Sequence, residues 1–318
     1  MVLVDYAGGR ELQSVQQTLS GPFDIPTVLL EGADLAAMSL SLDLQTGLLN
    51  VGGQWIRPAV VWIRHSSACA IVAQARPAGS VTPLAANSWS ILLQQLAGSE
   101  AFALPGAAPP GPVQLLDAER LGISTPRTVI TTDVVAGAKQ MRTPRIIVKI
   151  PDFRLFEPDR QNWAACLPTI VDRDAVLGEP AADRGPVIVQ EYHSHARELR
   201  VFYLDDGICA FEVHKAEPAS MWTDPESVVV TKVACPPVVA DAVRTLSTAW
   251  RLRFGAFDLL ISDSGEPVFL EVNADGDWLW YERKARWHGV SFMAAVMVRQ
   301  LFLQRTPRGG QVDERDGR

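Results

Sequence analysis

Three oxygen-bearing side chains lie close together in the C-terminal third of this 318-residue chain, at a spacing that suits a magnesium site. Asp258 lies in one apolar run of strand length, and Glu271 and Asn273 lie in the next. Asp263-Ser-Gly-Glu between the runs is typical of a hairpin turn. Because side chains alternate along a strand, Glu271 and Asn273 are expected on one face. Oxygen ligands of this kind suit Mg²⁺. A polar rim on a half-buried hairpin would show the same pattern.

Charged residues also occur within two other predicted strands. Lys149 ends the apolar run Arg145-Ile-Ile-Val-Lys, where it would either reach a phosphate as a compact point charge or occupy a solvated edge position. Glu198 and Arg200 are two residues apart, which places them on one strand face. Arg200 would stabilise phosphoryl charge, although a surface ion pair would have the same spacing.

Several phrases of the chain resemble one enzyme superfamily. The sequence Phe-Leu-Glu-Val-Asn-Ala-Asp-Gly-Asp-Trp-Leu-Trp-Tyr-Glu at 269–282 resembles the terminal signature of ATP-grasp ligases. Its Asn-x-x-Gly-x-Trp-Leu-Trp form is similar to graspetide synthetases, which crosslink ribosomal peptides. A predicted helix followed by Gly122-Ile-x-x-Pro resembles the ATP-grasp entrance, and Val61-Trp-Ile-Arg-His resembles a Trp-x-Arg-Arg strand end of the same group. The specific matches cover residues 104–303.

The resemblance implies an α/β (α+β) chain with the ATP-grasp fold. We expect an N-terminal pre-ATP-grasp α/β domain at 1–103, a central lobe at 104–190, a C-terminal lobe with the metal site at 191–305 and a disordered polar tail at 306–318. The Pro- and Gly-rich stretch at 104–112 breaks any regular element and marks the main boundary.

The resemblance also assigns roles to residues and implies ATP and Mg²⁺ as cofactors. It makes Lys149 and Arg200 the catalytic cations and places adenine and ribose at the end of a strand near residue 190. The nucleotide-binding residues would be Lys149, Gln190, Glu191, Tyr192 and Glu198, and the metal ligands would be Asp258, Glu271 and Asn273.

Two departures from the family pattern bear on ATP use. Gly111 stands where the family usually has a lysine, so either Lys139 or Arg142 replaces a phosphate contact or nucleotide affinity is lower. The segment 151–160 contains no glycine, whereas many relatives cover the phosphates with a Gly-rich flap. Side-chain clamps would have to serve there instead; the candidates are Arg154 and Arg160.

The implied reaction is an ATP-dependent ligation through an acyl phosphate, which needs no enzyme nucleophile. The preferred hypothesis is crosslinking of Asp or Glu side chains of a ribosomal precursor peptide, with leader and core, to Ser, Thr or Lys. A ligase of free small carboxylic acids and amines is the first alternative. The second is a degenerate, non-catalytic peptide-binding protein, which the glycine at 111 motivates. The family resemblance also implies a homo-oligomer.

Composition limits the other classes of function. A net charge of -7 argues against a general nucleic-acid binder, and 47% hydrophobic residues argue against disorder over most of the chain. No apolar run reaches membrane-spanning length and no secretion signal is evident, so we expect a cytoplasmic protein. The other residues that could bind a metal or substrate are expected to have structural roles. The four widely spaced cysteines, Cys69, Cys166, Cys209 and Cys235, are predicted to be buried thiols, and His193 and His195 to be loop residues. Trp278 and Trp280 are predicted to lie in the core, although either could instead form a wall of the acceptor site.

Overall fold

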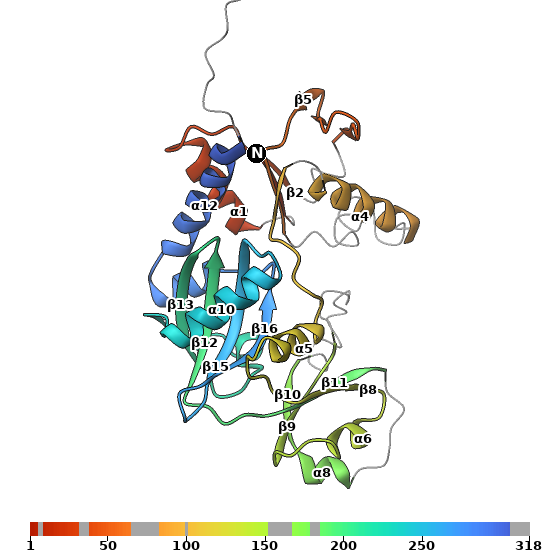
Figure 1. Ribbon diagram of the computed structural model, residues 1–318, viewed down its shortest axis with the longest axis vertical. Coiled ribbons are helices and arrows are strands. Elements are labelled where there is room, and N and C mark those ends of the chain that lie inside the picture. The colour runs from red at the N-terminus through yellow and green to blue at the C-terminus, as the bar shows by residue number, and fades with distance from the viewer. Residues whose placement is uncertain are drawn as a thin grey trace, which may run out of the picture. The chain divides into compact units, whose positions relative to one another are not determined.

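The computed structural model describes residues 1–5, 9–31, 38–64, 83–98, 101–151, 167–178 and 185–305 (Figure 1). The chain divides into two compact units, one formed by Met1–Gly106 with the segment from His288 onward, and one formed by Ala107–Trp287. The division after residue 106 falls inside the predicted boundary at 104–112. The last helix groups with the first unit, whereas the sequence-based division ended the C-terminal lobe at 305; the three-part scheme stays a prediction.

The N-terminal unit is built on a four-stranded parallel sheet in the order β2-β1-β6-β7. Its strands are β1 (Val2–Asp5), β2 (Val28–Glu31), β6 (Val60–Ile63) and β7 (Phe102–Leu104), and its helices are α1 (Arg10–Ser20), α4 (Pro83–Ala97) and α12 (Gly289–Arg305). The C-terminal helix α12 packs against α1, where the Phe23 and Phe292 rings lie 6.4 Å apart.

A second, small sheet in this unit has three antiparallel strands, whereas the apolar runs at 40–49 and 53–57 predict only a small hairpin. They are β3 (Leu40–Leu42), β4 (Leu49–Val51) and β5 (Gln54–Ile56). The apolar runs of the sequence also predict a strand that ends near Arg64 and a helix at 87–96, and the structure has β6 and α4 at these places, with helix ends that differ by up to four residues.

The second unit begins with α5 (Val113–Arg120), which Gly122 follows with φ +78°, as a helix-stopping glycine requires. A four-stranded antiparallel sheet in the order β10-β9-β11-β8 comes next. It comprises β8 (Thr128–Thr131), β9 (Arg145–Lys149), β10 (Thr169–Asp172) and β11 (Val187–Glu191), with helices α6 (Val134–Ala138) and α8 (Arg173–Leu177).

The sequence from 174 to 186 is loop-like in its residue types and predicts a loop, and this prediction is wrong for its first part, because α8 occupies it. The helix is nucleated by its N-cap, because the Asp172 side chain accepts the backbone N–H groups of Asp174 and Ala175 at 2.9 and 3.1 Å. Asp172, an N-cap residue type at the end of the strand β10, was the signal in the sequence for this helix, and a search for hydrophobic periodicity does not detect it.

A five-stranded antiparallel sheet in the order β14-β13-β12-β15-β16 forms the rest of this unit. Its strands are β12 (Arg197–Leu204), β13 (Gly207–His214), β14 (Val229–Val233), β15 (Phe254–Ile261) and β16 (Pro267–Asn273). Helix α10 (Pro237–Ala249) packs on one face through a large apolar core (Figure 1). Helices α9 (Ser220–Thr223) and α11 (Leu279–Ala285) complete the unit.

The predicted hairpin carrying the acidic residues is confirmed as β15 and β16, and Gly265 in its turn has φ +87°. The pairing is not regular. Asp258 pairs with Glu271 but Leu259 pairs with Phe269, so Leu270 is the extra residue of a β-bulge.

No helix in the described ranges is long and apolar enough to cross a membrane. Cys209 and Cys235 are both free thiols; the prediction of a buried thiol is confirmed for Cys209, whereas Cys235 is only half-buried, and Cys69 and Cys166 lie outside the described residues. The predicted disordered tail at 306–318 also lies outside them.

Candidate functional site

Asp258 on β15 lies directly between a cation and a second carboxylate on neighbouring strands. It pairs in register with Arg200 on β12 and with Glu271 on β16. Arg200 Nη1 donates to Asp258 Oδ2 at 2.6 Å, and Asn273 Nδ2 donates to Glu271 Oε1 at 3.4 Å. The structure therefore brings together the three predicted metal ligands and the predicted catalytic arginine.

The guanidinium of Arg200 is enclosed, with its side chain only 8% exposed. It lies over the rings of Phe202 and Tyr281, at 5.6 and 5.3 Å from their centroids. Burial lowers the pKa of Arg200, but Asp258, Tyr281 and Glu271 together outweigh that effect and raise the pKa above its ordinary value. Nε of Arg200 is buried and has no hydrogen-bond partner in the described part of the chain. The site thus holds a permanent cation with an unused donor.

The two carboxylates sit in different environments. Burial raises the pKa of Asp258, and the neighbouring Glu271 acts in the same direction, while Arg200 opposes both. The side chain of Asp258 is 22% exposed, whereas that of Glu271 is 47% exposed. One carboxylate is therefore enclosed against the guanidinium, and the other is open to an incoming group.

The structure gives a steric reason for the glycine at position 276 of the Asn-x-x-Gly-x-Trp-Leu-Trp sequence. A Cβ built on it would lie 2.3 Å from Ala256 Cβ and 2.8 Å from Arg200 Nη2, both far inside van der Waals contact. The chain after β16 therefore passes directly over the guanidinium, and only glycine allows that approach.

The two indoles that follow have packing roles. Trp278 is fully buried and meets Phe254 edge to face, with centroids 5.5 Å apart. Trp280 is half-buried and makes a similar contact with Tyr281 at 4.9 Å. The core interpretation of Trp278 is confirmed.

Lys149 reaches the acidic cluster from the other sheet of the same unit. Its Nζ lies 3.9 Å from Glu271 Oε2, and its side chain is 20% exposed. The alternative of a solvated edge position is wrong, because β9 is flanked by β10 and β11. Opposed sheets thus place a lysine ammonium beside an open carboxylate, an arrangement suited to a ligand that carries both a cation and phosphate oxygens.

The predicted adenine-binding strand end is tightly bonded within the protein. The backbone N–H groups of Glu191 and Tyr192 donate to the carbonyls of Arg127 and Arg145 at 2.9 and 3.2 Å. The carboxylate of Glu191 accepts the N–H of Arg142 at 2.7 Å. An adenine at this strand end would have to use main-chain groups other than these two N–H groups.

The side chains at the same strand end are also engaged. Gln190 is buried and donates to Thr128 Oγ1 at 2.8 Å, and the Arg145 guanidinium lies 4.3 Å above the Tyr192 ring. Lys139 is exposed, and Arg142 is held near the strand end by its N–H bond to Glu191.

Glu198 has a cationic partner that the sequence did not indicate. Lys215, which follows β13, donates from Nζ to Glu198 Oε1 at 2.5 Å, and both side chains are about seven-eighths buried, at 13% and 14% exposure. The pairing depends on how β12 and β13 align, so it could not be read from residue spacing. A ribose hydroxyl would have to share the Glu198 carboxylate with Lys215.

The departures from the family pattern are explained in part. Gly111 has φ +44°, and a Cβ there would lie 3.6 Å from the Pro151 carbonyl oxygen, so this backbone conformation disfavours a lysine. The clamp candidates Arg154 and Arg160 lie outside the described residues.

The histidines near the strand end make local contacts. Nδ1 of His195 lies 2.9 Å from the His193 carbonyl, and Nε2 of His193 lies 3.8 Å from Glu191 Oε2. Among the described residues, no group of three or more His, Cys, Asp and Glu side chains is placed to hold a metal. A metal site here must therefore count the amide oxygen of Asn273 and oxygens of the ligand.

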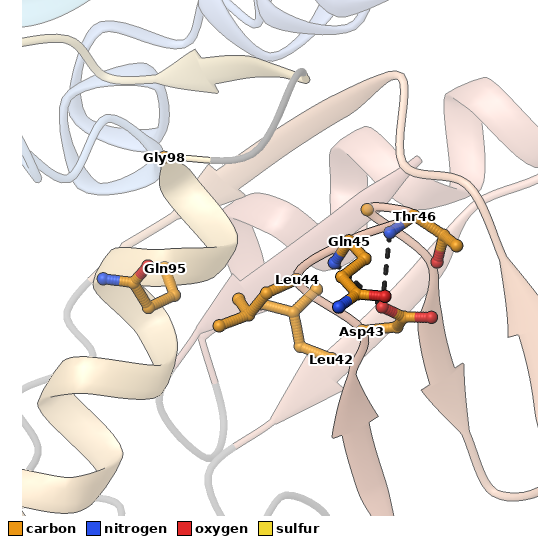
Figure 2. Close-up of a pocket in the computed structure, with 8 residues that line it drawn as sticks. Leu42, Asp43, Leu44, Gln45, Thr46, Gln95 and Gly98 are labelled. Carbon is orange, nitrogen blue, oxygen red and sulfur yellow. Dashed lines mark hydrogen bonds between the residues drawn. The ribbon is translucent and has the colours of Figure 1, made fainter.

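A cavity of about 280 Å³ on the N-terminal unit is separate from these residues (Figure 2). It is lined by the β3–β4 turn and the end of α4. Asp43, its charged lining residue, is occupied by the turn itself, since its Oδ1 accepts the N–H groups of Gln45 and Thr46 at 2.9 and 3.2 Å. The Thr46 side chain, followed by these two N–H groups, lowers the pKa of Asp43 through hydrogen bonds. This cavity carries no reactive group for chemistry.

Comparison with solved structures identifies the fold. The chain is similar to the macrocyclase MdnC bound with precursor peptide MdnA from Microcystis aeruginosa MRC, with 16% identity over 94% of this chain and 100% of that chain and a TM-score of 0.72. It is also similar to the ATP-grasp ligase PsnB complexed with a phosphomimetic variant of minimal precursor, Mg and ADP, with 19% identity over 94% and 97% of the chains and a TM-score of 0.71.

A third similar structure is the D-alanyl-alanine synthetase A from Vibrio cholerae O1 biovar eltor, with 15% identity over 95% of this chain and 98% of that chain and a TM-score of 0.59. No protein-family model and no curated protein matches the sequence. The chain has the ATP-grasp fold, as the resemblance predicted.

Proposed function

We propose that this protein is an ATP-dependent ligase that joins a carboxylate to an amine or hydroxyl through an acyl phosphate, with release of ADP and phosphate. The observation that carries the proposal is the cluster in which Asp258, Glu271 and Asn273 lie between Arg200 and Lys149. Hard oxygen donors flanked by two cations suit a magnesium-bound triphosphate. The fold supports the same conclusion, because PsnB, an ATP-grasp ligase of similar structure, was solved in complex with Mg and ADP.

The residues present fit a magnesium ion. Asp258, Glu271 and Asn273 would hold it, and the carboxylate of Glu271 is open enough to receive it. When bound, the ion neutralises phosphate charge during phosphoryl transfer. The enclosed Asp258 serves a second purpose, since its bond to Arg200 fixes the guanidinium in place.

The cations would divide the phosphate contacts between two sheets. Lys149 approaches Glu271 from β9, and Arg200 lies under Gly276 with its buried Nε unused. Both would stabilise negative charge on the transferred phosphoryl group, which develops as the substrate carboxylate attacks phosphorus. The end of β11, with Gln190, Glu191 and Tyr192, would contact the adenine, and Glu198 with its partner Lys215 would contact the ribose.

The proposed substrate is a ribosomal precursor peptide whose Asp or Glu side chains are joined to Ser, Thr or Lys side chains. Three features support a peptide substrate. They are the Asn-x-x-Gly-x-Trp-Leu-Trp sequence, the overall similarity to MdnC with its precursor MdnA, and the similarity to PsnB with its minimal precursor. The enzyme would act on the core of the peptide and bind its leader.

A ligase of free small acids and amines is the second candidate, because the D-alanyl-alanine synthetase has the same fold. A non-catalytic binding protein is the third. The geometry at Gly111 weakens it, since glycine there satisfies the backbone conformation and need not mark the decay of a site.

Nucleotide binding is tested first by calorimetry with Mg²⁺ and ADP, comparing the intact protein with Glu271→Gln. We expect magnesium-dependent binding in the intact protein and its loss in the variant. The exposed Glu271 is the better choice for this comparison, because replacing the enclosed Asp258 also strips Arg200 of its partner.

Substrate class is tested by ATP turnover. A short Asp-, Glu- and Thr-rich peptide encoded beside the gene is incubated with the protein, ATP and Mg²⁺. Each crosslink should remove one water from the peptide mass and release one ADP. Turnover with free amino acids instead of the peptide would establish the second candidate, and nucleotide binding without any turnover would establish the third.

A further inference from the structure

Gln114, the second residue of α5, makes three hydrogen bonds through one buried side chain. Its Oε1 accepts the N–H of Val272 at 2.8 Å, and its Nε2 donates to the carbonyls of Val272 at 3.1 Å and Pro109 at 2.9 Å. The residue is 5% exposed. A side-chain amide has two donor hydrogens, so these bonds satisfy both donors and the acceptor. Gln114 therefore pairs with the outer edge of β16 as a neighbouring strand would.

Val272 lies between Glu271 and Asn273, the two proposed metal ligands on this strand. Because the N–H and C=O of Val272 point away from β15 toward Gln114, those of its two neighbours point toward β15. The side-chain amide of Gln114 thus hydrogen-bonds the backbone of Val272, the one residue of the segment 271–273 whose backbone groups do not face β15.

A second contact lies on the other side of the bulge. Phe269 N donates to the carbonyl of Ser124 at 2.9 Å, again on the outer edge of β16. In a regular strand, residues three apart face opposite edges, so Phe269 and Val272 can both face outward only because Leu270 is inserted between them. The two outer contacts bracket the bulge that turns Glu271 toward the site while Phe269 and Val272 stay in the core.

We propose that Gln114 is a positioning residue that fixes the bulged segment of β16, and so sets the aim of Glu271 and Asn273 at the metal. The inference rests on the proposed function, since it concerns the same metal site. Its basis is the paired hydrogen bonds to Val272 together with the position of the bulge, and Gln114 itself touches no reacting group.

The test compares Gln114→Met, which keeps the side-chain length and loses the three bonds, with Leu115→Ala. Leu115 is the next residue of α5 and is buried in the core, so its truncation destabilises the same helix without removing the bonds to Val272. Gln114→Asn, which keeps the amide but shortens its reach, is the second variant in case the methionine prevents folding.

Two quantities are measured. The first is the affinity for Mn²⁺ in the presence of ADP, determined by electron paramagnetic resonance. The second is the rate of backbone amide hydrogen exchange at single residues, determined without ligand. We expect Gln114→Met to weaken Mn²⁺ binding about tenfold, which corresponds to about 1.4 kcal/mol. It should also speed exchange at Val272 while Glu271 and Asn273 keep their protection. Leu115→Ala should lower the melting temperature at least as much as Gln114→Met does, but it should leave the affinity for Mn²⁺ unchanged.

Each outcome separates the two proposals. Absence of Mn²⁺–ADP binding in the intact protein would overturn the proposed function and this inference with it. Tight binding in the intact protein and equally tight binding in Gln114→Met and Gln114→Asn would overturn the positioning role alone. Equal weakening in Leu115→Ala would do the same, because it would show that loss of helix stability is sufficient.

Discussion

The two sheets of the second unit hold the residues of the candidate site in different ways. The five-stranded sheet holds Arg200 and Asp258 as an enclosed pair above a large apolar core. The four-stranded sheet has a small core and presents Lys149 together with the bonded strand end near Glu191. Metal and phosphate recognition demands fixed side-chain geometry, which requires deep packing. The comparison indicates that the five-stranded sheet fixes the positions of Arg200 and Asp258, and that the four-stranded sheet supplies Lys149 from the opposite side.

The largest expected effect concerns the enclosed carboxylate. Asp258→Asn should reduce ligation at least about a hundredfold. It should also destabilise the fold by about 3–5 kcal/mol, because Arg200 would remain buried without its counter-charge. Activity assays and thermal unfolding measure the two effects.

Glu271→Gln is the matched control for that result. It should reduce activity as much but change the free energy of unfolding by less than about 0.5 kcal/mol, since Glu271 is half-exposed. Equal destabilisation by both variants would mean that the two carboxylates share one environment, contrary to the structure.

Two glycines that flank strands of the two sheets, Gly276 after β16 and Gly185 before β11, should respond differently to an added methyl group. Gly276→Ala forces a carbon against Ala256 and Arg200, which should cost about 1–3 kcal/mol of stability. Gly185→Ala, before β11, meets no atom of the described residues within 4 Å and should be neutral or stabilising by up to about 1 kcal/mol. Chemical denaturation measures both; a tolerated Gly276→Ala would show that the segment over Arg200 can shift.

The cation of the four-stranded sheet should matter mainly for nucleotide affinity. Lys149→Met keeps the length of the side chain and removes its charge, so Mg²⁺–ATP binding should weaken about tenfold with little change in stability. Lys284→Met on α11 serves as the control for loss of one positive charge. Unchanged affinity in Lys149→Met would place the lysine outside the phosphate site.

The smallest effect probes how firmly the five-stranded sheet is closed. Burial of Cys209 on β13 raises its pKa to about 12, so the native thiol stays neutral and should resist alkylation at pH 8. Its stabilising contribution is complete below the unfolded pKa of about 8.5 and is lost as pH rises toward 12. Site-resolved mass spectrometry checks this; rapid native labelling of Cys209 would mean that the sheet opens readily.

Much of the geometry of the candidate site was predictable because it depends on local patterns. The alternation of apolar residues placed Glu271 and Asn273 on one face, and the turn chemistry at Gly265 placed Asp258 on the paired strand. The resemblance supplied the ATP-grasp fold, which solved structures then confirmed. The helix at 173–177 was missed because a short capped helix has too few turns to show a hydrophobic period.

The sequence by itself determined the strands, their faces and the charges they carry, because these follow from residue types and from periods of two or three to four residues. Only the tertiary structure decided that Arg200 meets Asp258 across 58 positions, and that Gln114 holds Val272 across 158. It also inserted the bulge at Leu270. Such contacts depend on strand register and on the packing of distant segments, and no local period in the chain encodes either.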